Sequence, residues 1–351
     1  MAVTLSGNVA KRNVLVVNAG SSSLKLGVLG PDDTVLAARH VERWDADTGP
    51  LRDFLAAAPA VDAVGHRVVH GGAATSALLI DDHVRADLER LTSLAPLHQP
   101  RALAGIDAVG EVLPGVRQVA CFDTAFHATM PPHATTYALP SQWRQKWDLR
   151  RYGFHGLSHA YASRRAVELA GAPDARVVSC HLGAGASLAA IHKGRSVDTT
   201  MGFTPLAGLV MATRSGDVDP GLLVWLLRAG LSLDELEDGL EHHSGLAGLS
   251  GTGDMRDVRR AAEAGDERAM LALRVYVHRL CQAIAAMAAS LGGIDVLVFT
   301  GGVGEHDAEL RTEVGARLAF LGAMDVFVVE AREDLEIAGR TRAVLDFEEC
   351  S

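Results

Sequence analysis

The sequence predicts an α/β protein built from two related halves. Short apolar runs of the kind found in buried strands alternate with segments of helical character. Each half opens with two strand-like runs around a glycine-rich turn, at 14–17 and 24–29 and again at 176–180 and 186–191. Strands that alternate with helices form sheets covered by helices, so this order indicates an α/β fold with an internal duplication.

Other elements follow in order along the chain. Further strands are predicted at 63–69, 116–122, 295–299 and 326–329, and helices at 85–95, 101–113, 221–229, 266–291, 307–321 and after Glu333. Asp219-Pro220 is typical of a helix start, and Gly292 of a helix end. The segment 131–151 carries Pro and Trp and is predicted to be an irregular crossing between domains.

Glycine-rich turns follow predicted strands at three places. They are Asn18-Ala-Gly-Ser-Ser-Ser-Leu-Lys25, His181-Leu-Gly-Ala-Gly-Ala-Ser187 and Thr300-Gly-Gly-Val-Gly-Glu305. Glycine has no Cβ, so backbone N–H groups in such turns can approach an anion closely. Three of them in one chain indicate a nucleotide held in a cleft between the two halves.

Composition excludes several classes of protein. The 351 residues are enough for two domains, and 48% hydrophobic with 22% charged residues is typical of a globular chain. The net charge of −10 argues against a nucleic-acid or acidic-membrane surface. The N-terminus lacks the apolar core of a signal peptide, and the apolar segment 269–291 carries Arg274 and Arg279, so a cytoplasmic protein without a membrane span is expected.

Several charged or polar residues are candidates for chemistry, and each has a structural alternative. Arg67 lies in a strand that ends in glycines and could simply pair with a carboxylate. Arg214 precedes a capped helix, where an anionic ligand is favoured, but it could instead hold down Asp217 or Asp219.

The remaining candidates are less distinctive on their own. Asp123 follows a strand, where α/β proteins place ligands, or it caps the next turn. His155, flanked by glycines and aromatic residues, and Glu333, at a strand end, would attract no notice alone. The segment 250–257 is either a turn into a helix or a site for ribose or metal contacts.

Taken together, these segments resemble the acetate kinase family, within the acetate and sugar kinase/heat-shock protein/actin superfamily. The resemblance runs in order from residue 14 to about 342. It is carried by VLVVNAGSSSLK, GHRVVHGG, LAPLHQP, FDTAFH, MPPHATTYALP, RRYGFHGLSH, CHLGAGASL, MGFTPLAGL, TRSGDVDP, FTGGVGE and VVEAREDLEIA.

The resemblance implies two ribonuclease-H-like domains, an actin-like duplication with the active site in the interdomain cleft. It places 1–149 plus 335–351 in an N-terminal domain and 150–334 in a C-terminal, nucleotide-binding domain. It implies reversible, direct in-line transfer of the ATP γ-phosphoryl group to acetate, with propionate second, giving an acyl phosphate. Mg²⁺, for which Mn²⁺ can substitute, and a homodimer are also implied.

The resemblance assigns roles position by position. Asp123 matches the active-site aspartate, and His155 and Arg214 match the groups that stabilise the transferring phosphoryl. Arg67 matches the residue that holds the substrate carboxylate, in an apolar pocket of Val69, Leu97, Phe154 and Pro205. Asn18 and Glu333 match the magnesium-associated residues. The nucleotide contacts are Ser21, Ser23, Lys25, His181, Leu182, Gly183, Ala184, Gly185, Asp254, Met255, Arg256, Gly302, Val303, Gly304, Glu305 and His306.

The chain departs from the family pattern mainly around the nucleotide. Ala184 and His306 stand where the family usually carries Asn, Ala73 replaces a Glu, and two segments are shortened. We therefore expect weaker and less selective ATP binding with an unchanged reaction type. Two alternatives stay open: a kinase for a longer acid such as butyrate, and a catalytically weak nucleotide-binding regulator.

Overall fold

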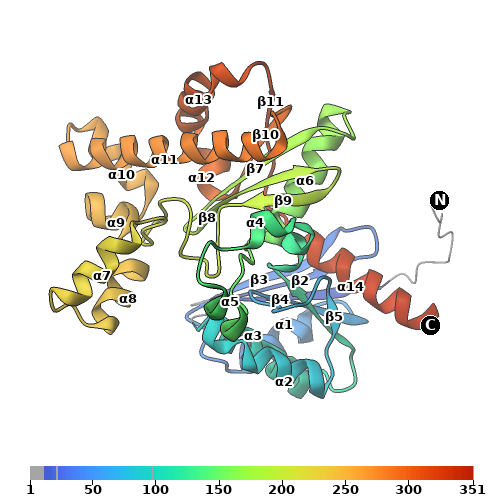
Figure 1. Ribbon diagram of the computed structural model, residues 1–351. Coiled ribbons are helices and arrows are strands. Elements are labelled where there is room, and N and C mark those ends of the chain that lie inside the picture. Colours follow the sequence, from blue (N-terminus) through green and yellow to red (C-terminus); the bar gives the residue numbers. More distant parts are fainter. Residues whose placement is uncertain (1–11, 21–22, 97, 351) are drawn as a thin grey trace. The chain divides into compact units, whose positions relative to one another are not determined.

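A computed structural model describes residues 12–20, 23–96 and 98–350, and these form two compact units (Figure 1). The first unit runs to Ala125 and resumes at Arg332, and the second covers Phe126–Ala331. Each unit holds one sheet with helices packed against it. The predicted mixed α/β class is confirmed.

The first unit has a six-stranded sheet in the order β3-β2-β1-β4-β6-β5. The chain forms β1 to β3 as antiparallel neighbours, and β4 and β6 then extend the sheet in parallel from β1. The strands are β1 Val14–Ala19, β2 Ser23–Leu29, β3 Val35–Glu42, β4 Ala63–Val68, β5 Leu78–Leu79 and β6 Gln118–Phe122.

Helices cover the first sheet. Its helices are α1 Gly49–Ala57, α2 Asp82–Arg90, α3 Gln99–Val112 and α14 Glu333–Cys350. Val64 of β4 belongs to a core shared with α1 and α3, whereas a Cβ built on Gly65 would lie 2.7 Å from Ile337 of α14. Successive side chains of a strand point to opposite faces, so Arg67 shares the face of Gly65, toward α14.

The second unit has a five-stranded sheet in the order β11-β10-β7-β8-β9. The strands are β7 Arg176–Leu182, β8 Ala186–His192, β9 Arg195–Thr199, β10 Val296–Thr300 and β11 Asp325–Val328. α6 (Gly156–Ala170) packs against β7 and β10 with buried Ala162 and Ala166, and α11 (Glu267–Leu291) packs against β7, β8 and β9. The other helices are α4 Pro132–Thr135, α5 Ser141–Trp147, α7 Pro220–Arg228, α8 Leu233–His242, α9 Gly245–Ser250, α10 Met255–Glu263, α12 Gly301–His306 and α13 Ala308–Arg317.

The two sheets repeat one topology. In both, the first three strands form an antiparallel meander, and two later strands join in parallel beside the first. The first sheet adds only the short edge strand β5. The duplication that the glycine turns and strand pairs predicted is therefore present in the strand order.

The unit boundaries differ from the expected ones after residues 149 and 334. Segment 126–149 belongs to the second unit because it is bonded to it: His127 contacts Ser196, and the Tyr137 hydroxyl accepts from Phe203 N at 2.8 Å. Glu333 belongs to the first unit because it begins α14. The segment predicted to be irregular also contains the short helices α4 and α5.

Several element predictions need correction. The third glycine-rich turn is the short helix α12, entered directly from β10. The helix expected at 85–95 starts at Asp82, because the side chain of Asp81 caps it by accepting from Val84 N at 2.7 Å. The strand β3 and helix α6 had no counterpart in the prediction. Within the described residues, no helix combines the length and apolarity needed to cross a bilayer.

Candidate active site

The first unit gathers an arginine and carboxylates at the ends of its strands. Asn18 lies near the end of β1, Arg67 in β4, and Asp123 directly after β6, where its N–H donates to Val68 O at 3.1 Å. Glu333 is the first residue of α14. Because β1, β4 and β6 are parallel neighbours, their carboxyl ends meet at one edge of the sheet.

Arg67 is the centre of this cluster. Its Nη2 donates to Asp123 Oδ2 at 2.7 Å and its Nε to the same oxygen at 3.1 Å. Its Nη1 lies 3.5 Å from Asn18 Oδ1, and its Nε lies 3.6 Å from Glu333 Oε2. We call Asn18, Arg67, Asp123 and Glu333 the acidic cluster. The alternative of an arginine paired with a carboxylate is thus the observed geometry of Arg67.

Burial and charge oppose each other at Asp123. The side chain is 1% exposed, and burial raises its pKa to about 6 although Arg67 counteracts the shift. Glu333 adds to the rise, because a second negative charge disfavours ionisation. For Arg67, burial alone would lower the pKa, but the charges of Asp123 and Glu333 outweigh it and hold the pKa above its usual value.

Other predicted residues of the first unit lie near this cluster or outside the described part. Lys25 is exposed on β2 and sits directly opposite Asn18 in the β1–β2 register. Ser23 opens β2, and its carbonyl accepts from Gly20 N at 2.8 Å. Val69 is buried after β4. Ser21 and Leu97 lie outside the described residues.

Oxygen ligands in the acidic cluster fit a hard divalent cation, but they do not form a closed cage. Among the described residues, no group of three or more His, Cys, Asp or Glu side chains is arranged to hold a metal. Mg²⁺ is commonly bound by one or two carboxylates together with waters and phosphate oxygens. Asp123 and Glu333 could supply that protein share.

In the second unit, His155 and Arg214 meet beside Gly185. A Cβ built on Gly185 would lie in ordinary van der Waals contact with both, 3.4 Å from His155 Nε2 and 3.5 Å from Arg214 Nη1, so both side chains end beside this residue. His155 precedes α6 with a left-handed backbone, φ +55°, which is uncommon outside glycine and is over-represented at functional sites. Two cationic or hydrogen-donating groups thus converge over the second glycine turn.

The partner of Arg214 differs from both sequence interpretations. Its Nε forms an ion pair with Glu241 of α8 at 2.9 Å, not with Asp217 or Asp219. Asp217 instead accepts from Gly208 N at 2.8 Å, and Asp219 caps α7. The loop is joined to the second glycine turn, because Ala212 N donates to Ala184 O at 3.0 Å.

The predicted nucleotide segments of the second unit line one cavity of about 900 Å³. The predicted residues in its lining are Gly183, Ala184, Asp254, Met255, Arg256, Gly302, Val303 and His306. Segments 183–184, 254–256 and 302–306 are far apart in the sequence, and the fold brings them to one cavity. His181, Leu182, Gly185, Gly304 and Glu305 are not in the lining.

Two of the predicted nucleotide contacts, Asp254 and Glu305, form hydrogen bonds to other residues of the second unit. Asp254 caps α10 and forms a two-point pair with Arg256, whose hydrogen bonds lower the Asp254 pKa to about 2. The Glu305 carboxylate accepts from Gly301 N and Ala331 N, both at 2.9 Å, and so braces the start of α12.

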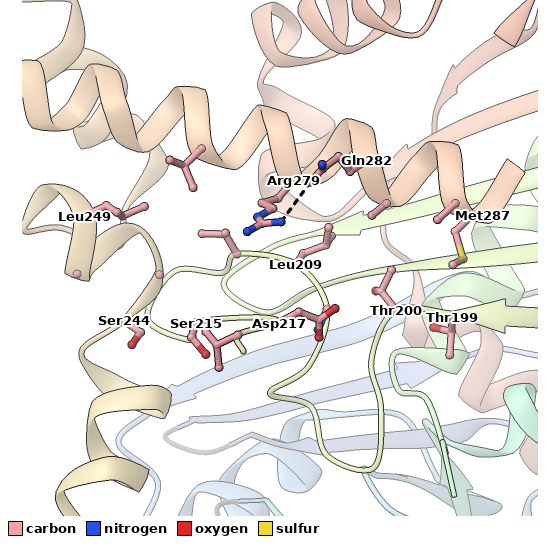
Figure 2. A pocket seen from close by; sticks show the side chains of 18 of the residues that line it. Thr199, Thr200, Leu209, Ser215, Asp217, Ser244, Leu249, Arg279, Gln282 and Met287 are labelled. Atoms are coloured by element: carbon pink, nitrogen blue, oxygen red, sulfur yellow. Dashed lines mark hydrogen bonds between the residues drawn. The ribbon is translucent and has the colours of Figure 1, made fainter. Parts of the chain in front are cut away.

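A second cavity of about 790 Å³ lies in the same unit (Figure 2). Its walls include Thr199, Leu209 and Asp217 together with Arg279 and Gln282 of α11, and Arg279 Nη1 donates to Gln282 Oε1 at 3.3 Å. None of the predicted site residues lines it. The predicted nucleotide residues that line a cavity all line the other one.

Residues predicted for the acyl-chain pocket are divided between the units. Val69 belongs to the first, whereas Phe154, which is 1% exposed, and partly buried Pro205 belong to the second.

Sequence reasoning missed Glu241, Arg259 and Asp307. Arg259 lines the 900 Å³ cavity and pairs with Asp307 at 2.6 Å, and Asp307 caps α13. Asp307 directly after the third glycine segment was a readable helix-start signal. Glu241 gave no signal, because its partner is 27 residues away in a different element.

Comparison with known proteins places these features in context. Residues 50–335 match the model of the acetokinase family. An acetate kinase of Clavibacter sepedonicus is 47% identical over 345 residues, covering 88% of this chain and 87% of its own.

Solved structures of an acetate kinase and a propionate kinase are also similar to this chain. A crystal structure of Porphyromonas gingivalis acetate kinase matches 95% of this chain and 100% of its own, with a TM-score of 0.88 and 38% identity. A propionate kinase from Francisella tularensis subsp. tularensis has a TM-score of 0.89 and 34% identity at the same coverage.

Proposed function

This chain belongs to the acetokinase family, and on that premise we propose that it transfers the γ-phosphoryl group of ATP to a short-chain carboxylate, acetate first and propionate second. It is a phosphotransferase with a carboxyl acceptor. The product is an acyl phosphate, and the transfer is direct, in line and reversible. Its use of ATP supports a cytoplasmic location.

The observation that carries this proposal is the convergence of His155 and Arg214 beside Gly185, on the unit whose cavity gathers the nucleotide segments. Phosphoryl transfer needs alignment and charge neutralisation more than covalent help. A guanidinium and an imidazole N–H are suited to stabilising the oxygens of the transferring group. Both side chains end beside Gly185.

The acidic cluster supports a carboxylate as acceptor. Arg67 offers a planar set of donors for the substrate carboxylate. A carboxylic acid with a pKa of about 4 is already ionised at neutral pH, so the reaction needs no general base. We assign to Asp123 the orientation of the metal and its waters, in contrast to the deprotonation that a hydroxyl acceptor would demand.

The family uses ATP with a divalent metal, and we propose Mg²⁺, with Mn²⁺ as a substitute. Asp123, Glu333 and Asn18 would hold it, partly through water. When bound, the ion neutralises phosphate charge. The oxygen-rich donor set supports this choice, since Mg²⁺ favours oxygen ligands.

We also propose a homodimer, because α7 carries an apolar surface that the chain leaves uncovered. Leu222, Val224, Trp225 and Leu227 are 45%, 47%, 63% and 41% exposed, and no residue of α7 is buried. Contiguous exposed apolar side chains mark association surfaces. Sedimentation equilibrium should give a dimer for the wild type and a monomer for Trp225→Glu; a monomeric wild type would exclude the proposal.

One assay tests the catalytic proposal. ATP-dependent acyl phosphate formation is measured with hydroxylamine as trap, using acetate, propionate and butyrate as acceptors. We expect acetate to react fastest, then propionate, then butyrate. Faster phosphorylation of glycerol or a sugar, or no product with any acid, would overturn the proposal.

A further inference from the structure

We propose that Ser187, supported by His159 and Ser179, is a positioning residue that holds His155 with its proton on Nε2, the ring nitrogen beside Gly185. The proposal rests on the role given to His155 above. Nothing in the motif resemblance assigns a function to Ser179, His159 or Ser187. A chain of hydrogen-bond contacts leads from the buried face of the second sheet to His155.

The fold brings these side chains to one interface. His159, Ala162 and Ala166 are spaced at i, i+3 and i+7, so they form one face of α6, and the two alanines are buried against the sheet. His155 is the residue directly before this helix. Ser187 shares the face of Ala189 on β8, and Ser179 shares the face of Val177 on β7, both of which pack against α6. Helix periodicity and strand alternation therefore place both serines against His159, and Ser187 also contacts His155.

The contacts are continuous. Ser179 Oγ lies 2.9 Å from His159 Nδ1, and His159 Nε2 lies 2.8 Å from Ser187 Oγ. Ser187 Oγ in turn lies 2.9 Å from His155 Nδ1. Ser179, His159 and Ser187 are each 0% exposed, so the chain from Ser179 to Ser187 is shielded from water.

Proton counting gives the chain a direction. Burial keeps the His159 pKa well below its ordinary value, so the ring is neutral and carries one proton for two nitrogens. The Ser187 hydroxyl has one proton and two histidine partners. One arrangement satisfies every contact: Ser179 O–H donates to His159 Nδ1, His159 Nε2–H donates to Ser187 Oγ, and Ser187 O–H donates to His155 Nδ1.

In that arrangement, neutral His155 must carry its proton on Nε2. The reverse direction would leave the buried Ser179 hydroxyl proton without an acceptor among the described residues, and an unsatisfied buried donor is destabilising. The imidazole then presents an N–H beside Gly185, where Arg214 Nη1 also lies. An N–H donor, and not a lone pair, is what a phosphoryl oxygen requires.

Histidine ¹⁵N chemical shifts test the relay without any activity measurement. At a pH where His155 is neutral, the wild type should show the Nε2–H form, and Ser187→Ala should show a mixture of both tautomers. A His155 that carries its proton on Nδ1 in the wild type would overturn the proposal. The His155 resonances are assigned by their loss in His155→Ala.

Kinetics test whether the reaction uses the relay. Ser187→Ala should lower kcat about tenfold with KM values for acid and ATP within about twofold, and Ser179→Ala should lower it less. Ser163→Ala is the matched control, because Ser163 is a buried serine of α6 whose hydroxyl donates within its own helix, to Ala160 O at 3.2 Å. Its kcat should stay within about twofold.

A double-mutant cycle separates positioning from simple loss of stability. If Ser187 acts through His155, adding Ser187→Ala to His155→Ala should change kcat by less than about twofold. A full tenfold loss in the His155→Ala background would overturn the relay. Unchanged activity of His155→Ala alone would instead refute the proposed role of His155, while the ¹⁵N shifts still decide the tautomer.

Discussion

The acidic cluster of the first unit and the groups around Gly185 in the second unit stabilise their charges in different ways. In the first, Arg67 pairs with Asp123 at 2.7 Å and lies 3.6 Å from Glu333, so positive and negative side chains compensate each other directly. In the second, a neutral serine–histidine chain leads to His155, and Arg214 forms an ion pair with Glu241. Under the proposed function, the first unit holds an acid and an ion with paired charges, whereas the second stabilises a transient phosphoryl group with oriented donors.

Arg214→Lys changes the arginine beside Gly185 and should cause the largest loss of activity among these variants. Lysine keeps the charge but loses the planar fork that can serve Glu241 and a phosphoryl oxygen together. We expect kcat to fall about 100-fold or more, measured by steady-state acyl phosphate formation. Arg260→Lys, at an exposed pair with Asp257, is the control and should be unchanged. Near-normal kcat for Arg214→Lys would reduce Arg214 to a structural residue.

Arg67→Ala removes the arginine of the acidic cluster, and it should change KM more than kcat. Loss of a charge-assisted hydrogen bond to the acid should raise KM for acetate about 10- to 150-fold, with a smaller change in kcat. Arg85→Ala is a matched control, because Arg85 makes a two-point pair with Asp107 on the surface of the same unit. If kcat falls and KM for acetate does not rise, Arg67 acts on the transition state, and the two regions no longer differ in this respect.

Ala184→Asn tests whether the second glycine turn contributes to ATP affinity. Ala184 lines the 900 Å³ cavity, and an added amide can donate to or accept from the nucleotide. We expect ATP affinity to rise about tenfold by calorimetry, with stronger discrimination against GTP. Ala229→Asn, placed where α7 ends, should leave ATP affinity unchanged. Unchanged or weaker ATP binding in Ala184→Asn would show that the altered loop binds the nucleotide by other contacts.

Glu333→Gln should have the smallest effect. Removing one carboxylate charge that acts partly through water should raise the Mg²⁺ concentration for half-maximal rate about fivefold, with little change in kcat at saturating metal. Asp334→Asn is the neighbouring control, since Asp334 pairs with Arg332 at 2.8 Å. Full wild-type activity in excess EDTA would exclude the metal altogether.

Local patterns made most of the fold predictable. Uninterrupted apolar runs such as 14–17 and 295–299 marked the central strands, and Gly292 marked the end of α11, where it adopts φ +69°. Exposed strand β3 was missed because its side chains alternate too little between buried and exposed. Helix α6 was missed because its start is a left-handed histidine without a side-chain cap, so no start signal precedes it.

The sequence by itself determined the α/β class, the duplicated order of strands and the residues that resemble a family, because these depend on local periodicity and on motifs. Tertiary structure alone decided which of those residues touch: Arg67 with Asp123, Arg214 with Glu241, and Ser187 between His155 and His159. These pairs form across strands and helices that are distant in the chain. Their geometry depends on sheet register and on the face that each helix presents, and neither is fixed until the units have packed.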